Sequence, residues 1–259
     1  MRKCMVRQSA RPLLPHSQHK ERVRITRPCK RQWRSVLSNI SHTDAWLSLG
    51  LAFVGGYGDA ASFALAKTFT GHVTGNLVLA AIAIAAHEWR ALLGHLSAIV
   101  AFFIGIFLSV FIVRPLKAWS SWPLLPTVIG IEVILIVLAS LALASGMAHE
   151  IEIFVIFVSL ALGLQNGAFR CAGGISVHTT YLTGMITSLI STEAEQYASE
   201  VILPVVRNPD PRTELLCGIW IAFVVGAGAG AAMVLHFGAV GMLGAALLLI
   251  PLALRVVRA

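Results

Sequence analysis

Long apolar runs, separated by short polar gaps, dominate the chain from residue 46 onward. Each run is close to the roughly 20 residues that an α-helix needs to cross the hydrocarbon core of a bilayer. The segment at 178–192 is short and rich in Thr and Ser, and a polar stretch with three prolines follows it. The pattern predicts helical segments at 46–66, 70–87, 91–113, 123–145, 150–169, 178–192, 213–236 and 238–256. We therefore expect an all-α, polytopic transmembrane helix bundle with six to eight membrane helices.

A polar signature occurs twice inside these apolar surroundings. The first copy places Asp59 in a glycine-rich helix, followed by a Thr-Gly break at Thr74. The second copy places Asn166 in a similar helix, followed by a Thr-Gly break at Thr183. Aligning the two breaks sets Asp59 opposite Asn166 with a gap of two residues, and the apolar helices that follow each copy also correspond. The transmembrane domain at 46–256 therefore reads as two repeated halves, about 46–145 and 150–256.

The number of membrane crossings depends on the segments 70–87 and 178–192. If both cross, there are eight spans and the two halves run parallel. If both are re-entrant half-helices, six segments cross, the halves are inverted, and the only basic residues outside are Lys67 and Arg90. The excess of basic residues in cytoplasmic loops favours six spans, whereas the apolar run at 77–86 favours eight. Both alternatives place the two termini in the cytoplasm.

The composition agrees with a membrane protein, since 57% of the residues are hydrophobic, 12% are charged and the mean hydropathy is +0.79. Residues 1–45 hold 11 of the 20 Lys and Arg residues but only two acidic ones, a local net charge of 11 − 2 = +9. We expect this segment to be a disordered cytoplasmic tail that touches anionic lipid. A transit peptide or an extension upstream of the true start are the alternatives. The positive charge belongs to this tail and does not predict nucleic-acid binding.

At its two polar motifs the sequence resembles the YoaK-like family, bacterial integral membrane proteins classed as a domain of unknown function. The shared features are a Gly-x-x-Asp-Ala stretch, a Thr-Gly-Asn stretch, and a Gly-x-Gln-Asn stretch followed by Thr-Thr-x-x-Thr-Gly. The matching residues are Gly56, Asp59, Ala60, Thr74, Gly75, Asn76, Gly163, Gln165, Asn166, Thr179, Thr180, Thr183 and Gly184. Gly167 stands where the family has Ala, and Arg170 stands where it tends to have a basic residue. The resemblance covers about 46–256 and implies a fold and a place in the bacterial inner membrane, without a substrate.

Asp59 is the first candidate for a functional site. A carboxylate inside an apolar helix is costly unless it is protonated, paired or hydrated. Asp59 is therefore either a proton or cation site or a structural group that Tyr57, Asn76 or Asn166 holds by hydrogen bonds.

Each of the other candidate residues also has two interpretations, a role in ligand binding or a purely structural role. Thr74, Asn76 and Thr183 stand at helix starts, where they cap free N–H groups or help to bind an anionic group. Gln165 and Asn166 either hydrogen-bond across helices or contact a ligand. Two accessory candidates are Glu132, whose alternative is a packed carboxylate, and Arg170, whose alternative is an interfacial side chain that snorkels.

These residues favour a small-solute or ion-coupled permease with a central site formed by Asp59, Asn76, Gln165 and Asn166. The alternative is a non-transporting structural or accessory membrane protein whose polar groups only join helices. A membrane enzyme comes third, because the sequence has no nucleotide or nucleophile fingerprint and no metal-ligand spacing. We expect no catalytic residue, metal or cofactor; the expected partners are the lipid bilayer, a small solute or ion, and a second copy of the chain.

Overall fold

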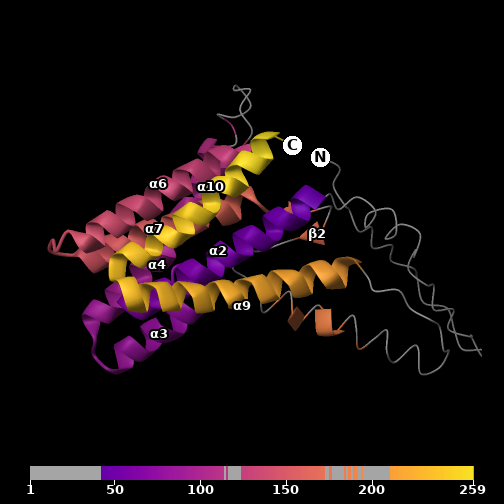
Figure 1. Ribbon diagram of the computed structural model, residues 1–259. Coiled ribbons are helices and arrows are strands. Elements are labelled where there is room, and N and C mark those ends of the chain that lie inside the picture. The colour runs from indigo at the N-terminus through magenta and orange to yellow at the C-terminus, as the bar shows by residue number, and fades with distance from the viewer. Residues whose placement is uncertain are drawn as a thin grey trace, which may run out of the picture.

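The computed structural model describes residues 42–113, 115, 124–172, 175–176, 184, 186–187, 189–191, 194 and 211–258. The helices are α2 (His42–Ala66), α3 (Val73–Ala85), α4 (Trp89–Leu108), α6 (Leu124–Ala144), α7 (Glu150–Ala168), α9 (Pro211–Phe237) and α10 (Leu243–Arg258). A π-helical turn, η1 (Ser109–Val113), extends α4, and a 3-10 turn, η2 (Gly238–Met242), joins α9 to α10. Two short strands, β1 (Cys171–Ala172) and β2 (Ile175–Ser176), pair after α7. The predicted helical bundle is confirmed (Figure 1), while most of 178–192 and the tail before residue 42 lie outside the described residues.

Six long helices run along the bundle within the described part of the chain: α2, α4, α6, α7, α9 and α10. The apolar stretch Arg212–Val257 is 46 residues long, more than twice the roughly 20 residues that one crossing needs. The chain turns back inside this stretch at η2, where Gly238 has a φ of +58° that favours glycine. The stretch therefore forms two separate helices, α9 and α10.

Helix α3 is the shortest of the described α-helices, and it is too short to cross a bilayer. Its 13 residues span about 20 Å, against a hydrocarbon core of about 30 Å. Ala66, Thr68, Glu88 and Arg90 line one surface cleft, so the ends of α2 and α3 and the start of α4 lie at the same end of the bundle. Helix α3 thus has the geometry of a re-entrant half-helix, which agrees with the six-span alternative for the first half of the chain.

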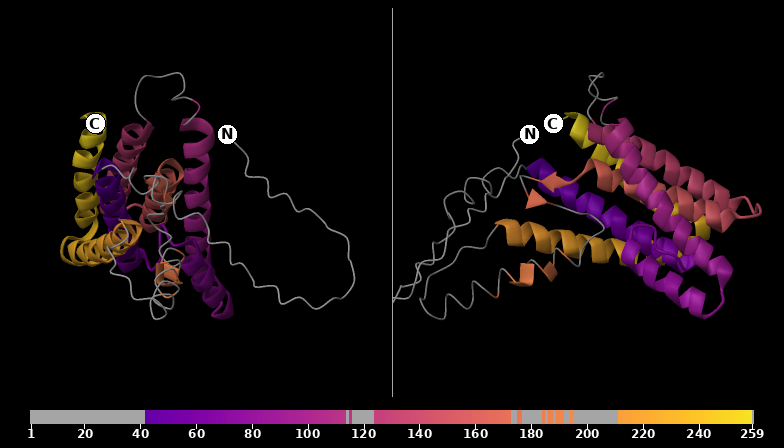
Figure 2. Two further views of the ribbon diagram at one scale, coloured as in Figure 1. Left: turned by 90° about the vertical axis from the view of Figure 1, so that its right-hand side faces the viewer. Right: turned by 180° about the vertical axis from the view of Figure 1, so that it is seen from behind.

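Two pairs of helices approach each other closely through glycines. In the first pair, a methyl group on Gly56 of α2 would overlap the carbonyl of Phe223 in α9, and one on Gly226 would overlap the carbonyl of Phe53. Figures 1 and 2 both show α9 running beside α2 along much of its length. Small residues permit such close backbone approach between membrane helices. We call this contact the α2–α9 seam.

The second pair repeats this arrangement between α4 and α7. A methyl group on Gly163 would overlap the carbonyl of Phe102, and one on Gly105 would overlap the carbonyl of Leu160. The spacing is also the same, because each glycine stands three residues after the residue whose carbonyl meets the partner glycine. The α4–α7 seam therefore matches the α2–α9 seam residue for residue.

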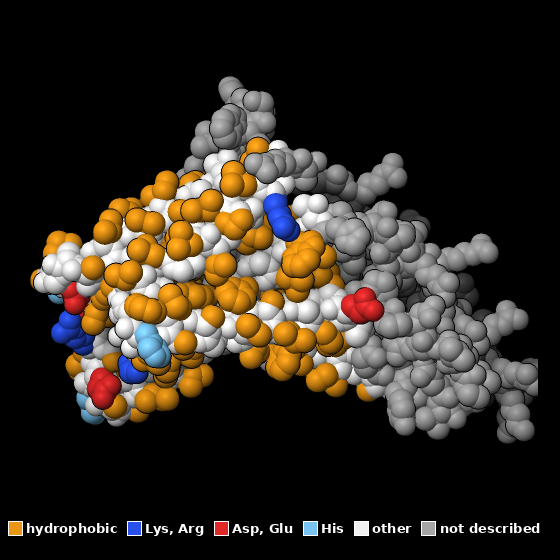
Figure 3. All heavy atoms as spheres, viewed as in Figure 1, with side chains coloured by type: hydrophobic (Ala, Val, Ile, Leu, Met, Phe, Trp, Pro, Cys, Tyr) orange, Lys and Arg blue, Asp and Glu red, His pale blue; other side chains and the backbone are white. Residues whose placement is uncertain are grey.

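The flank of the bundle is apolar, as a lipid-facing surface requires. Large hydrophobic side chains are exposed on every long helix, including Leu93, Phe103, Leu141, Leu235 and Leu247. Figure 3 shows apolar side chains across this flank, with charged and histidine side chains gathered toward the ends. The surface, together with the length of the helices, is that of an integral membrane protein.

Candidate functional site

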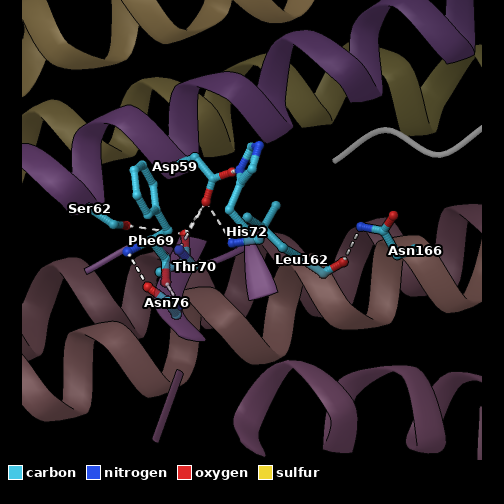
Figure 4. A network of polar contacts seen from close by, with 9 residues as sticks. Asp59, Ser62, Phe69, Thr70, His72, Asn76, Leu162 and Asn166 are labelled. Atoms are coloured by element: carbon cyan, nitrogen blue, oxygen red, sulfur yellow. Dashed lines mark hydrogen bonds and ion pairs between the residues drawn. The ribbon is translucent and has the colours of Figure 1, made fainter. Parts of the chain in front are cut away.

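The Asp59 carboxylate anchors the loop between α2 and α3. Asp59 stands seven residues before the end of α2, about 10 Å along the helix, and only 3% of its surface is exposed. Its Oδ1 accepts hydrogen bonds from the backbone N–H of Thr70 at 2.9 Å and of Gly71 at 2.6 Å, and a longer one from the Thr70 hydroxyl at 3.4 Å. Its Oδ2 pairs with Nδ1 of His72. The loop therefore folds back from the end of α2 into the bundle, to the depth of Asp59 (Figure 4).

Asn76 holds the same loop from the first turn of α3. Its Oδ1 accepts a hydrogen bond from the N–H of Phe69 at 3.0 Å, and its Nδ2 donates to the Phe69 carbonyl at 2.6 Å. The Phe69 ring stacks on Phe63, with 4.5 Å between the ring centroids. Non-helical backbone at membrane depth is tolerated only where its polar groups find partners. Asp59 and Asn76 supply these partners for a half-helix that starts inside the bundle.

The remaining candidates lie in separate contacts. Gln165 Nε2 donates to the carbonyl of Leu51 at 3.1 Å, which joins α7 to α2, and Asn166 Nδ2 donates to the carbonyl of Leu162 within α7 at 2.9 Å. Thr74 is exposed on α3, and Arg170 is exposed just after α7. Thr183 lies outside the described residues.

The partners of Asp59 differ from those expected. Tyr57 donates its hydroxyl to the carbonyl of Gly241 in η2, and Asn76 is engaged with Phe69. The groups that bind Asp59 are instead Thr70, Gly71 and His72. Sequence reasoning missed His72, although it stands inside the first polar motif, two residues before Thr74.

His72 couples this network to pH. The hydrogen bond with Asp59 raises the pKa of His72 above its ordinary value, burial lowers it, and the negative charge of Asp59 adds a smaller increase. The net effect on the pKa of His72 is upward, because its Nδ1 lies against Asp59 Oδ2.

We expect this pair to make stability depend on pH. Because the pKa of His72 is raised on folding, its contribution is complete below about pH 6.5, the ordinary value, and is lost as pH rises through the raised value. The melting temperature of the purified protein should fall as the pH rises across this window. The melting temperature of the His72→Gln variant should fall less over the same pH range. Parallel curves for the two proteins would contradict the prediction.

An open cleft of about 740 Å³ lies beside this loop, between the end of α2 and the starts of α4 and α7. Thr68, from the loop that Asp59 and Asn76 hold, lines it and contacts the buried His95 through Oγ1 and Nδ1 at 3.2 Å. At its rim, Nε and Nη2 of Arg90 donate to Glu152 Oε1 at 3.2 and 3.1 Å. The anchored loop thus forms part of the wall of a polar-rimmed cleft.

The sequence carried no signal that brings these cleft residues together, because Arg90 and Glu152 are 62 positions apart and belong to no motif. Within the described residues, no group of three or more His, Cys, Asp and Glu side chains is placed to hold a metal ion. The polar and charged side chains that line the cleft are Lys67, Thr68, Glu88, Arg90, His95 and Glu152.

Long apolar helices, a lipid-facing flank and a half-helix anchored at depth define a polytopic α-helical membrane protein. The chain belongs to the family described as "Protein of unknown function (DUF1275)", which matches residues 47–255. It is 30% identical over 147 residues to the UPF0700 transmembrane protein YoaK of Bacillus subtilis (strain 168), an alignment that covers 56% of this chain and 62% of that protein. The resemblance that the polar motifs indicated is confirmed. No solved structure matches the chain.

Proposed function

We propose that the chain is a permease for a small solute or ion, built from two inverted halves in the bacterial inner membrane. The observation that carries the proposal is the half-helix α3, whose preceding loop is bound at the depth of Asp59 and lines an open cleft. Discontinuous helices of this kind are typical of the central sites of secondary transporters. In the proposal, Asp59 and Asn76 hold the loop, and Thr68 and His95 line the path of the solute.

The two glycine seams support the repeat. If α2 corresponds to α7 and α4 to α9, the α2–α9 seam maps onto the α4–α7 seam, glycine on glycine. The same correspondence sets Asp59 on Asn166, since each stands three residues after the seam glycine of its own helix.

The direction of the helices supports the inversion. Helix α2 ends at the cleft with Ala66, whereas α7 begins there with Ile151 and Glu152. Corresponding helices therefore run in opposite directions. Inverted repeats let one arrangement open to either side of the membrane around a fixed site.

The orientation follows from the charges. The cleft end of the bundle carries Lys67 and Arg90, while most of the basic residues belong to the tail that precedes the opposite end of α2. Since cytoplasmic segments carry the excess of Lys and Arg, we place the cleft outside and both termini in the cytoplasm.

A transport assay with a blocked cleft tests the proposal. Proteoliposomes on a solid-supported membrane would receive jumps of four probes: a mixture of amino acids, a mixture of organic acids, a mixture of sugars, and potassium chloride. We expect a transient current or a tracer uptake for one of them, and its loss in Gly94→Trp, whose ring would project into the cleft.

Gly94→Ala is the matched control. Gly94 lines the cleft, and a methyl group there would meet, among the described residues, only Thr68 Oγ1 at 3.7 Å, which is ordinary contact. This variant should transport like the unchanged protein. A folded, monodisperse protein that gives the protein-free response to all four probes would contradict the permease and favour the structural alternative.

A further inference from the structure

Glu132 is a second acidic side chain inside the bundle, and its surroundings are unlike those of Asp59. It lies in α6, about 12 Å along the helix from Leu124 and about 18 Å from Ala144, and none of its surface is exposed. Neither carboxyl oxygen has a hydrogen-bond partner among the described residues. Asp59, in contrast, accepts bonds from two backbone amides and pairs with His72.

Among the described residues, no charge that could compensate Glu132 stands at its depth on the elements that pack most closely against α6. These elements are α7, α10, η1 and η2. Their described ionisable residues are Glu150 and Glu152 at the start of α7 and Arg255 and Arg258 at the end of α10, while η1 and η2 have none. Glu152 contacts Arg90, and Arg255 lies over the ring of Trp46 at 5.9 Å.

A second buried oxygen lies at a similar depth. Ser159 of α7, the helix packed on α6, is fully buried, and its Oγ also has no hydrogen-bond partner among the described residues. It stands nine residues after Glu150, about 14 Å from the end at which α6 finishes. Ser140, on α6 itself, donates to the carbonyl of Ile136 and is satisfied. Glu132 and Ser159 are thus buried polar groups whose side-chain oxygens have no hydrogen-bond partner among the described residues.

We infer that Glu132 is the proton-binding site of the permease proposed above. In the conformation described here an isolated charge is disfavoured, so the carboxyl group holds its proton. When the bundle opens to one side, Glu132 releases this proton to water, and when it opens to the other side an Oε atom takes one up. The inference rests on the proposed function for its coupling role, and on the burial of Glu132 for its protonation.

Infrared spectroscopy tests the protonation without transport, because the C=O stretch of a carboxylic acid is separate from the carboxylate bands. The full chain in lipid nanodiscs at neutral pH should show such a band. The band should be lost in Glu132→Gln, shifted in Glu132→Asp and unchanged in the control Ser140→Ala. Absence of the band in the unchanged protein, or its persistence in Glu132→Gln, would overturn the inference. If Glu132→Gln does not fold, the shift in Glu132→Asp decides.

Transport tests the coupling. The probe used is the one that the unchanged protein transports in the Gly94 assay. With it, Glu132→Gln should lose uptake driven by a pH gradient and keep exchange of labelled for unlabelled solute. Full pH-driven uptake in Glu132→Gln would overturn the inference about Glu132 but would leave the proposed permease function supported. If no probe is transported, the proposed permease function is contradicted. The infrared band then still shows whether Glu132 binds a proton.

Discussion

Replacing Gly226 by alanine is expected to destabilise the bundle more than any other added methyl group on α9. The new methyl would overlap the backbone carbonyl of Phe53, and backbone in a helix has little freedom to move aside. Inserting atoms into a packed contact costs about 1–3 kcal/mol, and here α2 and α9 must separate along their seam. The expected result is a clearly lower melting temperature and more aggregation on size exclusion in detergent.

Gly228→Ala is the control for this prediction. Gly228 lies two residues further along the same helix, and a methyl group there would meet no described atom within 4 Å. Alanine favours helix over glycine by up to about 1 kcal/mol, so this variant should keep or slightly raise the melting temperature. Equal melting temperatures for the two variants would show that the seam is looser than the structure indicates.

Asp59→Ala is expected to have the second large effect. It leaves the backbone N–H groups of Thr70 and Gly71 without their acceptor inside the bundle, at a cost of about 1–3 kcal/mol each. Thermal unfolding should shift strongly downward, and limited proteolysis should find a new cleavage site in the loop at 67–72.

Asp59→Asn separates the anchoring role from an ion-binding role. Its carboxamide oxygen can replace Oδ1 as the acceptor for both amides, but the charge opposite His72 is gone. We expect a smaller loss of stability than in Asp59→Ala, and unchanged transport per folded molecule with the probe that passes the cleft assay. A folded Asp59→Asn protein without transport would show that Asp59 itself binds the coupled ion.

The sequence was enough to predict the long helices that the structure describes, because their apolar length follows directly from the thickness of a bilayer. It also singled out Asp59 and Asn76, which both hold the loop between α2 and α3, although Asn76 binds Phe69 and not Asp59 as predicted. It did not predict that Asp59 binds backbone N–H groups, because every residue has such a group and the path of the loop decides which of them arrive. The sequence also could not predict the pairing of Arg90 with Glu152, because this contact depends on how α4 and α7 are placed relative to each other.

Hydropathy alone could not decide between six and eight membrane-spanning helices. The stretch at 73–85 is as apolar as a crossing helix, and only its length and its start at the depth of Asp59 distinguish it. Hydropathy indicates whether a segment can lie in a lipid or protein interior. The depth at which a helix begins depends instead on the polar contacts of the loop before it.

The two seams have a consequence for the order in which this protein is made. Each seam joins a helix made early to one made later, because α2 contacts α9 and α4 contacts α7. Chains fold as they leave the ribosome, beginning with the N-terminal part. When residue 145 has been synthesised, the seam partners of Gly56 and Gly105 have not yet been made. We therefore expect the first three long helices to enter the membrane without these contacts, and both seams to be complete only after α9 has been made.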